Sequence, residues 1–128
     1  MAPLSHKLNS YNMNAQIIEI DAAGKTPGRI ATAVVSILCG KHKPDFAPNV
    51  VSGDQVRVIN VGQMKFTGKK LEKNERITHS GYPGGLKRIP LKEAFARDSA
   101  RLLHETVRKM LPKNKLRDPR MKHLTVVK

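Results

Sequence analysis

Residues 16–40, QIIEIDAAGKTPGRIATAVVSILCG, contain the strongest signals for the fold class. They open with QIIEID, a run rich in β-branched side chains that predicts a strand over residues 16–21. Thr26 then suits a helix N-cap, and Pro27 suits the first helical position, where its missing N–H costs nothing. The stretch therefore predicts a strand, a short turn and a helix in succession.

The helix predicted after this turn has one apolar stripe, and Gly40 is well placed to end it. Further along, residues 55–60 (QVRVIN) alternate between two faces and predict a second strand. A strand, helix and strand at this spacing favour a right-handed crossover and parallel pairing of the strands. The predicted fold class is α/β. The apolar stripe of the helix consists of Ile30, Val34, Ile37 and Leu38.

The second half of the chain predicts more helix and one more strand. Residues 77–88 hold three glycines and a proline, which predicts an irregular segment, neither a helix nor a central strand. Apolar helical spacing begins after Pro90, which suits a first helical position, and Asp98 suits a cap, so we expect either a break there or two successive helices. A basic loop over residues 113–122 then leads to strand-forming residues 124–127.

Length and composition limit the possible classes of protein. The 128 residues predict a flexible N-terminal arm over residues 1–14 and a single α/β domain over residues 15–128. The longest apolar run, residues 30–39, is about half the ~20 residues that a membrane-spanning helix needs, so we expect no membrane contact. A single cysteine and the absence of a signal-peptide core predict a cytoplasmic protein, with an organelle as the alternative.

Charge is the most informative part of the composition. Lysine and arginine number 24 against 10 acidic residues, a formal net charge of +14. Residues 65–128 hold 18 basic and 6 acidic side chains, whereas residues 1–64 hold 6 and 4. Such an excess in one half of the chain predicts a nucleic-acid partner. The chain has only two tyrosines, three phenylalanines and no tryptophan, so it lacks the aromatic side chains needed to stack on the bases of single-stranded RNA. These counts favour structured RNA as the partner, contacted through its shape and its phosphates.

An enzymatic alternative rests on Gly24, Lys25 and Thr26, which follow a predicted strand as the end of a phosphate-binding loop does. That loop needs a glycine five positions before Gly24, and Glu19 stands there, inside the predicted strand. We therefore expect no nucleotide hydrolysis, no cofactor and no small-molecule substrate. The predicted helix N-terminus, with Lys25 and Arg29 beside it, suits a single backbone phosphate of a nucleic acid.

Metal binding and catalysis have no other support in the sequence. The five histidines and the one cysteine do not approach a metal-ligand spacing, and Ser80 next to His79 does not by itself make a catalytic pair. We predict no metal site and no catalytic residue. Two alternatives stay open: a nucleotide-dependent enzyme, which lacks the glycine spacing, and a DNA-compacting protein, which leaves the glycine-rich loop of residues 79–85 unexplained.

Six motifs in one order give the chain a specific resemblance, which covers residues 16–127. They resemble the family of bacterial-type large-subunit ribosomal protein thirteen. The motifs are Asp21-Ala22-x-Gly24-Lys25-x-x-Gly28-Arg29-x-Ala31, Gly40-Lys41-His42-Lys43-Pro44, Gly53-Asp54-x-Val56-x-Val58-Ile59-Asn60, Thr67-Gly68-Lys69-Lys70, His79-Ser80-Gly81-Tyr82-Pro83-Gly84-Gly85-Leu86-Lys87 and Met110-Leu111-Pro112-Lys113-Asn114-Lys115-Leu116.

The resemblance implies a three-layer α/β/α domain around a mainly parallel sheet of about four strands, with basic loop extensions. It also implies a non-enzymatic constituent of the large ribosomal subunit that binds the large-subunit rRNA, contacts neighbouring ribosomal proteins and supports early assembly. The side chains expected to bind rRNA lie in basic and glycine- or proline-rich loops. They are Lys25, Arg29, Lys41, His42, Lys43, Lys69, Lys70, His79, Tyr82, Lys87, Arg88, Lys113, Asn114 and Lys115.

Overall fold

The main sheet of the computed structural model is parallel and has three strands. The structure describes residues 16–44, 46–51 and 54–128, so the arm predicted over residues 1–14 lies outside the described residues. The strands at both edges pair in parallel with the central one, which confirms the strands predicted from the sequence. In sheet order they are β1 (Ile17–Asp21), β2 (Gln55–Ile59) and β5 (Leu124–Val126).

Helix α2 (Pro27–Leu38) connects β1 to β2, as the opening stretch predicts. Its apolar stripe is buried: Ile30, Val34 and Leu38 are at most 1% exposed. They belong to one core cluster with Val56 of β2, because every second residue of that strand points to the same side of the sheet. The α2 stripe therefore holds the crossover in place.

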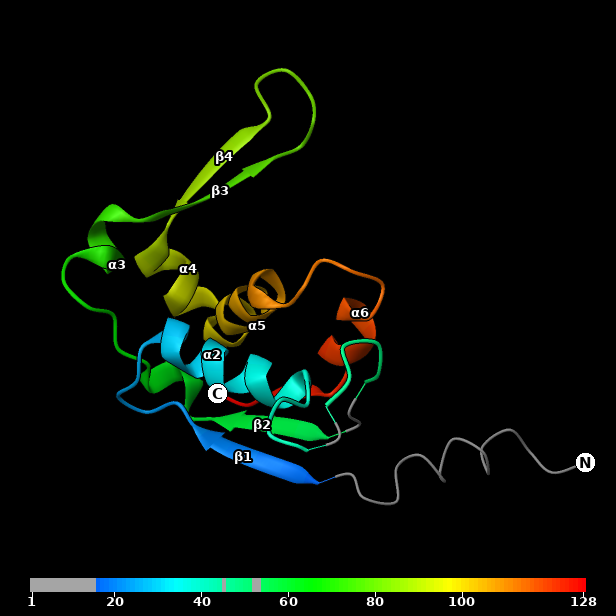
Figure 1. The fold of residues 1–128 in the computed structure, drawn as a ribbon. Helices are drawn as coiled ribbons and strands as arrows, with labels where there is room; N and C mark the ends of the chain where they lie inside the picture. The colour runs from blue at the N-terminus through cyan, green and yellow to red at the C-terminus, as the bar shows by residue number, and fades with distance from the viewer. Residues whose placement is uncertain (1–15, 45, 52–53) are drawn as a thin grey trace, which may run out of the picture.

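The helices of the described residues lie on one face of the main sheet (Figure 1). On the other face, Glu19 and Arg57 are paired across β1 and β2, with their side chains 56% and 50% exposed. This difference from the expected three layers has a physical reason, since burying these charged side chains under a further helix is costly. The α/β class and the mainly parallel sheet are confirmed, with three strands in the main sheet instead of about four.

Two further strands form a separate antiparallel hairpin, β3 (Glu75–His79) and β4 (Leu86–Pro90), which projects from the body (Figure 1). The sequence predicted only an irregular segment here, and the irregular part is the connection over residues 80–85. The pairing was missed because the strand-forming residues are few and interrupted by charges. Pro90 ends β4, so the next helix begins one residue later than predicted.

Two successive helices follow the hairpin, α4 (Leu91–Arg97) and α5 (Ser99–Met110), as expected. Asp98 separates them and caps α5, because its Oδ1 accepts a hydrogen bond of 3.1 Å from the N–H of Arg101. Leu103 and Val107 of α5 are fully buried in the core cluster and bring this helix against α2. None of the helices in the described ranges is long and apolar enough to cross a membrane.

Three short helices complete the described structure: η1 (Val61–Gln63), α3 (Lys70–Lys73) and α6 (Arg117–Met121). Helix α6 lies where the sequence predicted a basic loop. Arg120 is 2% exposed and Met121 is 7% exposed, so tertiary burial stabilises this turn of helix. The Arg120 guanidinium also donates a hydrogen bond of 3.2 Å to the carbonyl oxygen of Pro48.

The cap at Asp98 can be tested by substitution. Asp98→Ala removes the acceptor for the Arg101 N–H, and we expect the free energy of unfolding to fall by about 1 kcal/mol. Asp98→Asn keeps a capping oxygen and serves as the matched control. Urea unfolding followed by circular dichroism measures both variants, and equal stability of Asp98→Ala and the wild type would contradict the assignment.

Candidate nucleic-acid interface

The loops that follow β1 and β2 lie side by side at the carboxyl edge of the sheet. The N–H of Gly24 donates a hydrogen bond of 3.0 Å to the carbonyl oxygen of Gln63, and the N–H of Lys65 donates one of 3.0 Å to the carbonyl oxygen of Lys25. Gly24 has φ of +71°, a left-handed conformation that a residue with a side chain adopts only with strain. These bonds bring Lys25 next to Lys65, a cation that the sequence analysis did not select.

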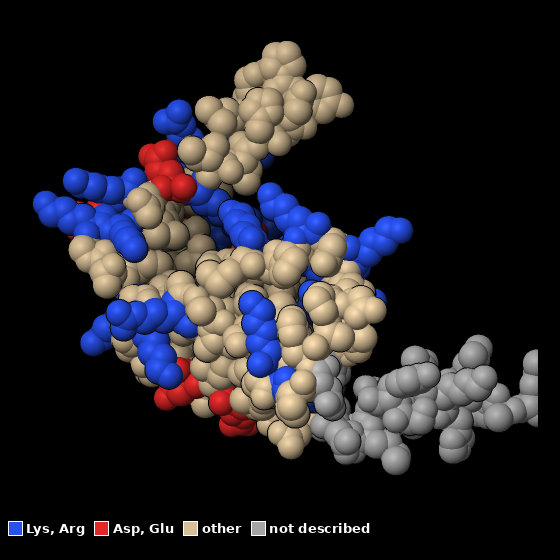
Figure 2. All heavy atoms as spheres, in the orientation of Figure 1, with Lys and Arg blue, Asp and Glu red and all other residues tan. Residues whose placement is uncertain are grey.

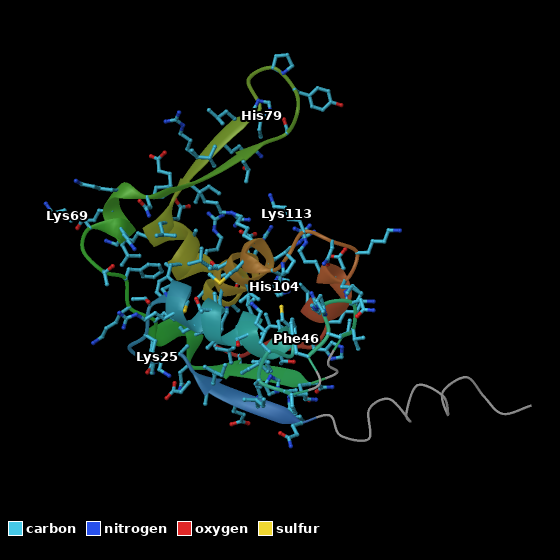
Figure 3. All side chains as sticks on the ribbon, in the orientation of Figure 1. Lys25, Phe46, Lys69, His79, His104 and Lys113 are labelled. Carbon is cyan, nitrogen blue, oxygen red and sulfur yellow. The ribbon has the colours of Figure 1, made fainter. Side chains whose placement is uncertain are left out.

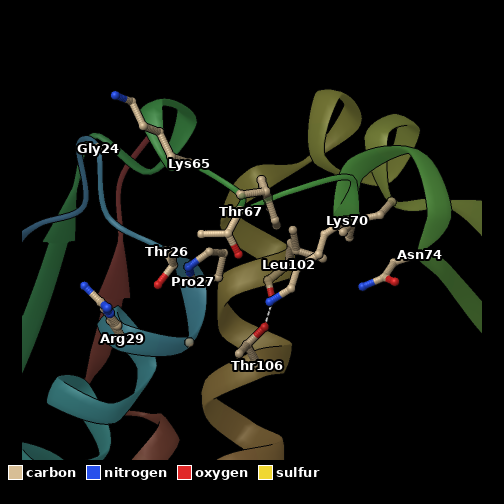
Figure 4. Close-up of a pocket in the computed structure, with 13 residues that line it drawn as sticks. Gly24, Thr26, Pro27, Arg29, Lys65, Thr67, Lys70, Asn74, Leu102 and Thr106 are labelled. Atoms are coloured by element: carbon tan, nitrogen blue, oxygen red, sulfur yellow. Dashed lines mark hydrogen bonds between the residues drawn. The ribbon is translucent and has the colours of Figure 1, made fainter.

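A groove of about 700 Å³ opens beside these loops, between α2, α3 and α5 (Figure 4). Three cations line it from three segments: Arg29 from α2, Lys65 from the loop after η1, and Lys70 from α3. None of its lining residues is acidic. The groove therefore joins two motifs that are far apart in the sequence, one around Arg29 and the other around Lys70. Its lining residues are Gly24, Thr26, Pro27, Gly28, Arg29, Lys65, Phe66, Thr67, Lys70, Asn74, Leu91, Leu102 and Thr106.

The first turn of α2 adds backbone donors to the same groove. Thr26 is the N-cap but makes no side-chain hydrogen bond to the helix. The N–H groups of Gly28 and Arg29 have no carbonyl acceptor within the helix, because they lie in its first turn. With exposed Lys25 and Arg29 alongside, this helix end has the donors and the charge that the phosphate contact expected from the sequence requires.

The loop after α2 is held by a buried carboxylate. Asp54 is 1% exposed, and its two oxygens accept hydrogen bonds from His42 Nε2 at 2.7 Å and Lys43 Nζ at 3.0 Å. Burial alone would raise the pKa of Asp54, but hydrogen bonds from Lys43, from the Gln16 N–H and from His42 outweigh it and hold the pKa below its usual value. Two of the three candidate side chains of this loop, His42 and Lys43, therefore have an internal partner, while Lys41 is exposed.

The Asp54 cluster makes stability depend on pH. Because the folded pKa is lowered, the contribution of Asp54 is complete above its unfolded pKa of about 3.9 and is lost as the pH falls through the folded value. We expect Asp54→Asn to lower the free energy of unfolding by about 2 kcal/mol at neutral pH. Urea unfolding at a series of pH values should show this difference shrinking below about pH 4.

Asp118→Asn is the control for that series, since the Asp118 side chain is 76% exposed and its Oδ1 lies 3.8 Å from a guanidinium nitrogen of Arg108. We expect this variant to match the wild type within a few tenths of a kcal/mol throughout. A stability loss in Asp54→Asn that stays the same from pH 7 to pH 3 would contradict the role assigned to the Asp54 carboxylate.

The hairpin tip carries the glycine-rich loop. A Cβ added at Gly85 would lie 2.0 Å from the Ser80 Oγ and 2.9 Å from the Tyr82 carbonyl oxygen, so this turn requires glycine there. Tyr82 is 76% exposed at the tip. His79 uses Nδ1 to accept a hydrogen bond of 2.9 Å from the Gly81 N–H, which is a structural role for one of its ring nitrogens. Lys87 and Arg88 are exposed on the same hairpin.

A second cationic groove, of about 640 Å³, lies between α5 and α6. It includes Lys113, whose neighbours Asn114 and Lys115 are also exposed. The Oδ1 of Asn114 accepts a hydrogen bond of 3.0 Å from the Leu116 N–H, so this side chain shapes the turn. Arg108 and Lys109 of this groove were not among the candidates, although their position at the end of a predicted helix was a signal, and Arg117 lies in the predicted basic loop. The groove is lined by Glu105, Arg108, Lys109, Lys113 and Arg117.

The candidate residues surround the body without forming one cluster. Figure 3 shows Lys69 just before α3, His79 on the projecting hairpin and Lys113 after α5, at well-separated places. Figure 2 shows many Lys and Arg side chains spread over the helical side and the base of the hairpin, and fewer Asp and Glu side chains, which appear near β1 and at the base of the hairpin. Phe46, which was not among the residues selected from the sequence, is an apolar side chain that is 44% exposed on the loop after α2. Nowhere in the described ranges do three or more His, Cys, Asp or Glu side chains come together as a metal site.

Comparison with known proteins gives the class of this molecule. The chain is 50% identical over 107 residues to the large ribosomal subunit protein uL13 of Thermus thermophilus, covering 84% of this chain and 76% of that protein. It is 47% identical over 124 residues to the protein of the same name from Clostridium botulinum, covering 93% and 86%. These are structural, non-enzymatic ribosomal proteins. The model of the ribosomal protein L13 family matches residues 15–128, and the chain belongs to that family.

Proposed function

We propose that this chain is a structural constituent of the large ribosomal subunit that binds the large-subunit rRNA and supports early assembly of that subunit. The observation that carries the proposal is the pair of cationic grooves on the helical side, one with Arg29, Lys65 and Lys70 and the other with Arg108, Lys109, Lys113 and Arg117. Its partners are rRNA and neighbouring large-subunit proteins, and its location is the ribosome.

The mechanism we infer is a set of phosphate contacts made by loops on a rigid body. The cations come from separate segments whose ends are fixed by the core, so the spacing of their backbones is set before RNA binds, and little backbone entropy is lost. Phosphate contacts of this kind fix position and carry little sequence information, whereas the shape of the RNA fold supplies specificity. The exposed tip with Tyr82, flanked by Lys87 and Arg88, adds one aromatic contact to an unpaired base or a sugar.

A rigid body with preset cations suits early assembly, because it can hold two RNA segments before other proteins arrive.

Large subunits washed in high salt and sedimented through sucrose should retain the chain in near-stoichiometric amount, as measured by mass spectrometry. Recovery of the chain only in the light fractions would contradict its place in the subunit. Equal affinity for duplex DNA and for large-subunit rRNA would favour the alternative of a DNA-compacting protein.

The salt dependence of rRNA binding tests the phosphate contacts directly. About eight contacts predict a slope of roughly −6 to −7 for log affinity against log salt. Replacing Lys69 and Lys70 together by alanine should weaken binding and reduce the magnitude of the slope by about 1.5, with no loss of stability since both are exposed. Filter binding across a salt series measures both quantities.

The matched control for this pair is Arg57→Ala, which removes a cation from the opposite, helix-free face of the sheet. We expect this variant to keep the wild-type affinity and slope. A wild-type affinity that hardly changes with salt would refute the mechanism, and an unchanged slope in the double variant would move the interface away from α3.

A further inference from the structure

The groove between α2, α3 and α5 has the position and size of a ligand site. It lies beside the loops that follow β1 and β2, and ligands of open α/β sheets bind outside the carboxyl ends of the strands. Its volume of about 700 Å³ is within the range of small-ligand pockets. Phosphate contacts alone need only a charged surface, so the presence of a cavity calls for a further explanation.

The chemistry of the groove differs from that of the other cationic surfaces. Its walls include the apolar side chains of Phe66, Leu91 and Leu102, which the groove between α5 and α6 lacks. The Phe66 ring is held in place by an edge-to-face contact with Phe95, at 5.1 Å between ring centroids and 82° between ring planes. A fixed aromatic ring beside aliphatic side chains is a surface on which a planar base can stack.

Three cations line the same groove as these apolar side chains. Arg29 and Lys65 lie on the rim, and Lys70 extends from α3 across the groove toward α5 (Figure 4). Polar groups for the base edge are present as well: Asn74 offers a donor and an acceptor. The Thr106 Oγ1 donates its proton to the Leu102 carbonyl oxygen at 2.8 Å, so its lone pairs are left to accept.

We propose that this groove receives one nucleotide of the rRNA, turned out of its stack, with the base against Phe66 and the phosphate between Arg29, Lys65 and Lys70. This inference rests on the proposed function and names the RNA feature that the groove selects. Cations continue along the outside of the groove, since a smaller depression lined by Lys69, Lys70 and Lys73 adjoins it at Lys70. That continuation favours one unit of a polymer over a free nucleotide, because neighbouring phosphates also find partners.

A variant that fills the groove without removing a cation tests the proposal. Thr67 is an exposed residue of the groove wall, so Thr67→Trp adds volume there with little effect on the core. We expect it to weaken binding of the full chain to purified large-subunit rRNA at least tenfold, because the added ring occupies the space proposed for the base. Thr125→Trp, at an exposed position of β5, is the matched control and should bind as the wild type does.

Ultraviolet cross-linking of the wild-type chain to the same rRNA gives a readout that needs no variant. We expect a nucleotide adduct on the peptide that contains Phe66. Wild-type affinity in a folded Thr67→Trp variant, or adducts confined to Phe46 and Tyr82, would overturn the proposal while the proposed function stands. Thr67→Trp losing affinity for 5′-AMP but not for rRNA would assign the groove to free nucleotides and would also overturn it. No rRNA binding by the wild type would instead refute the proposed function.

Discussion

The packing of α2 against the parallel pair β1 and β2 fixes the path of the chain across the sheet and brings the loops after both strands together. Ile30, Val34 and Leu38 are buried on Val56 and Val58, and no residue of this set is more than 1% exposed. A helix that joins two parallel strands must return along one face of the sheet, so both strands end at the same edge. The loops with Lys25 and Lys65 meet because of this burial, and their backbone hydrogen bonds follow from it.

The elements with strong periodicity could be predicted from the sequence. The alternation in residues 55–60, the stripe of α2 and the cap at Asp98 are local signals, and the structure confirms all three. The hairpin and α6 could not be predicted in this way, since both depend on contacts with distant residues. Helix α6 is stabilised by the burial of Arg120 and Met121, and β3 is tied to the body by an ion pair between Arg76 and Glu105 of α5.

The sequence could indicate which types of residue form the candidate site, but not which side chains they contact inside the protein. Lysines in loops indicate an anion partner whatever the fold, and most of those selected are exposed. The sequence does not show that Asp54 is buried against His42 and Lys43, because eleven or more residues separate the partners and only the fold joins them. Likewise, nothing in the local pattern around Phe66 indicates a groove, since its walls come from α2, α3 and α5 together.

Ion pairs between arginines and carboxylates reduce the charge repulsion in so basic a chain. Within the described part of the chain, carboxylates pair mainly with arginines, as Glu105 does with Arg76 and Arg101. Arginine suits such pairs because its planar group binds a carboxylate in a fixed geometry, whereas lysine is a mobile point charge that binds phosphate from many directions. The net charge of +14 disfavours the compact state through self-repulsion. The arginine pairs offset part of that repulsion within the protein, and the rRNA contacts proposed above would offset more of it, so that binding of this polyanion would stabilise the fold.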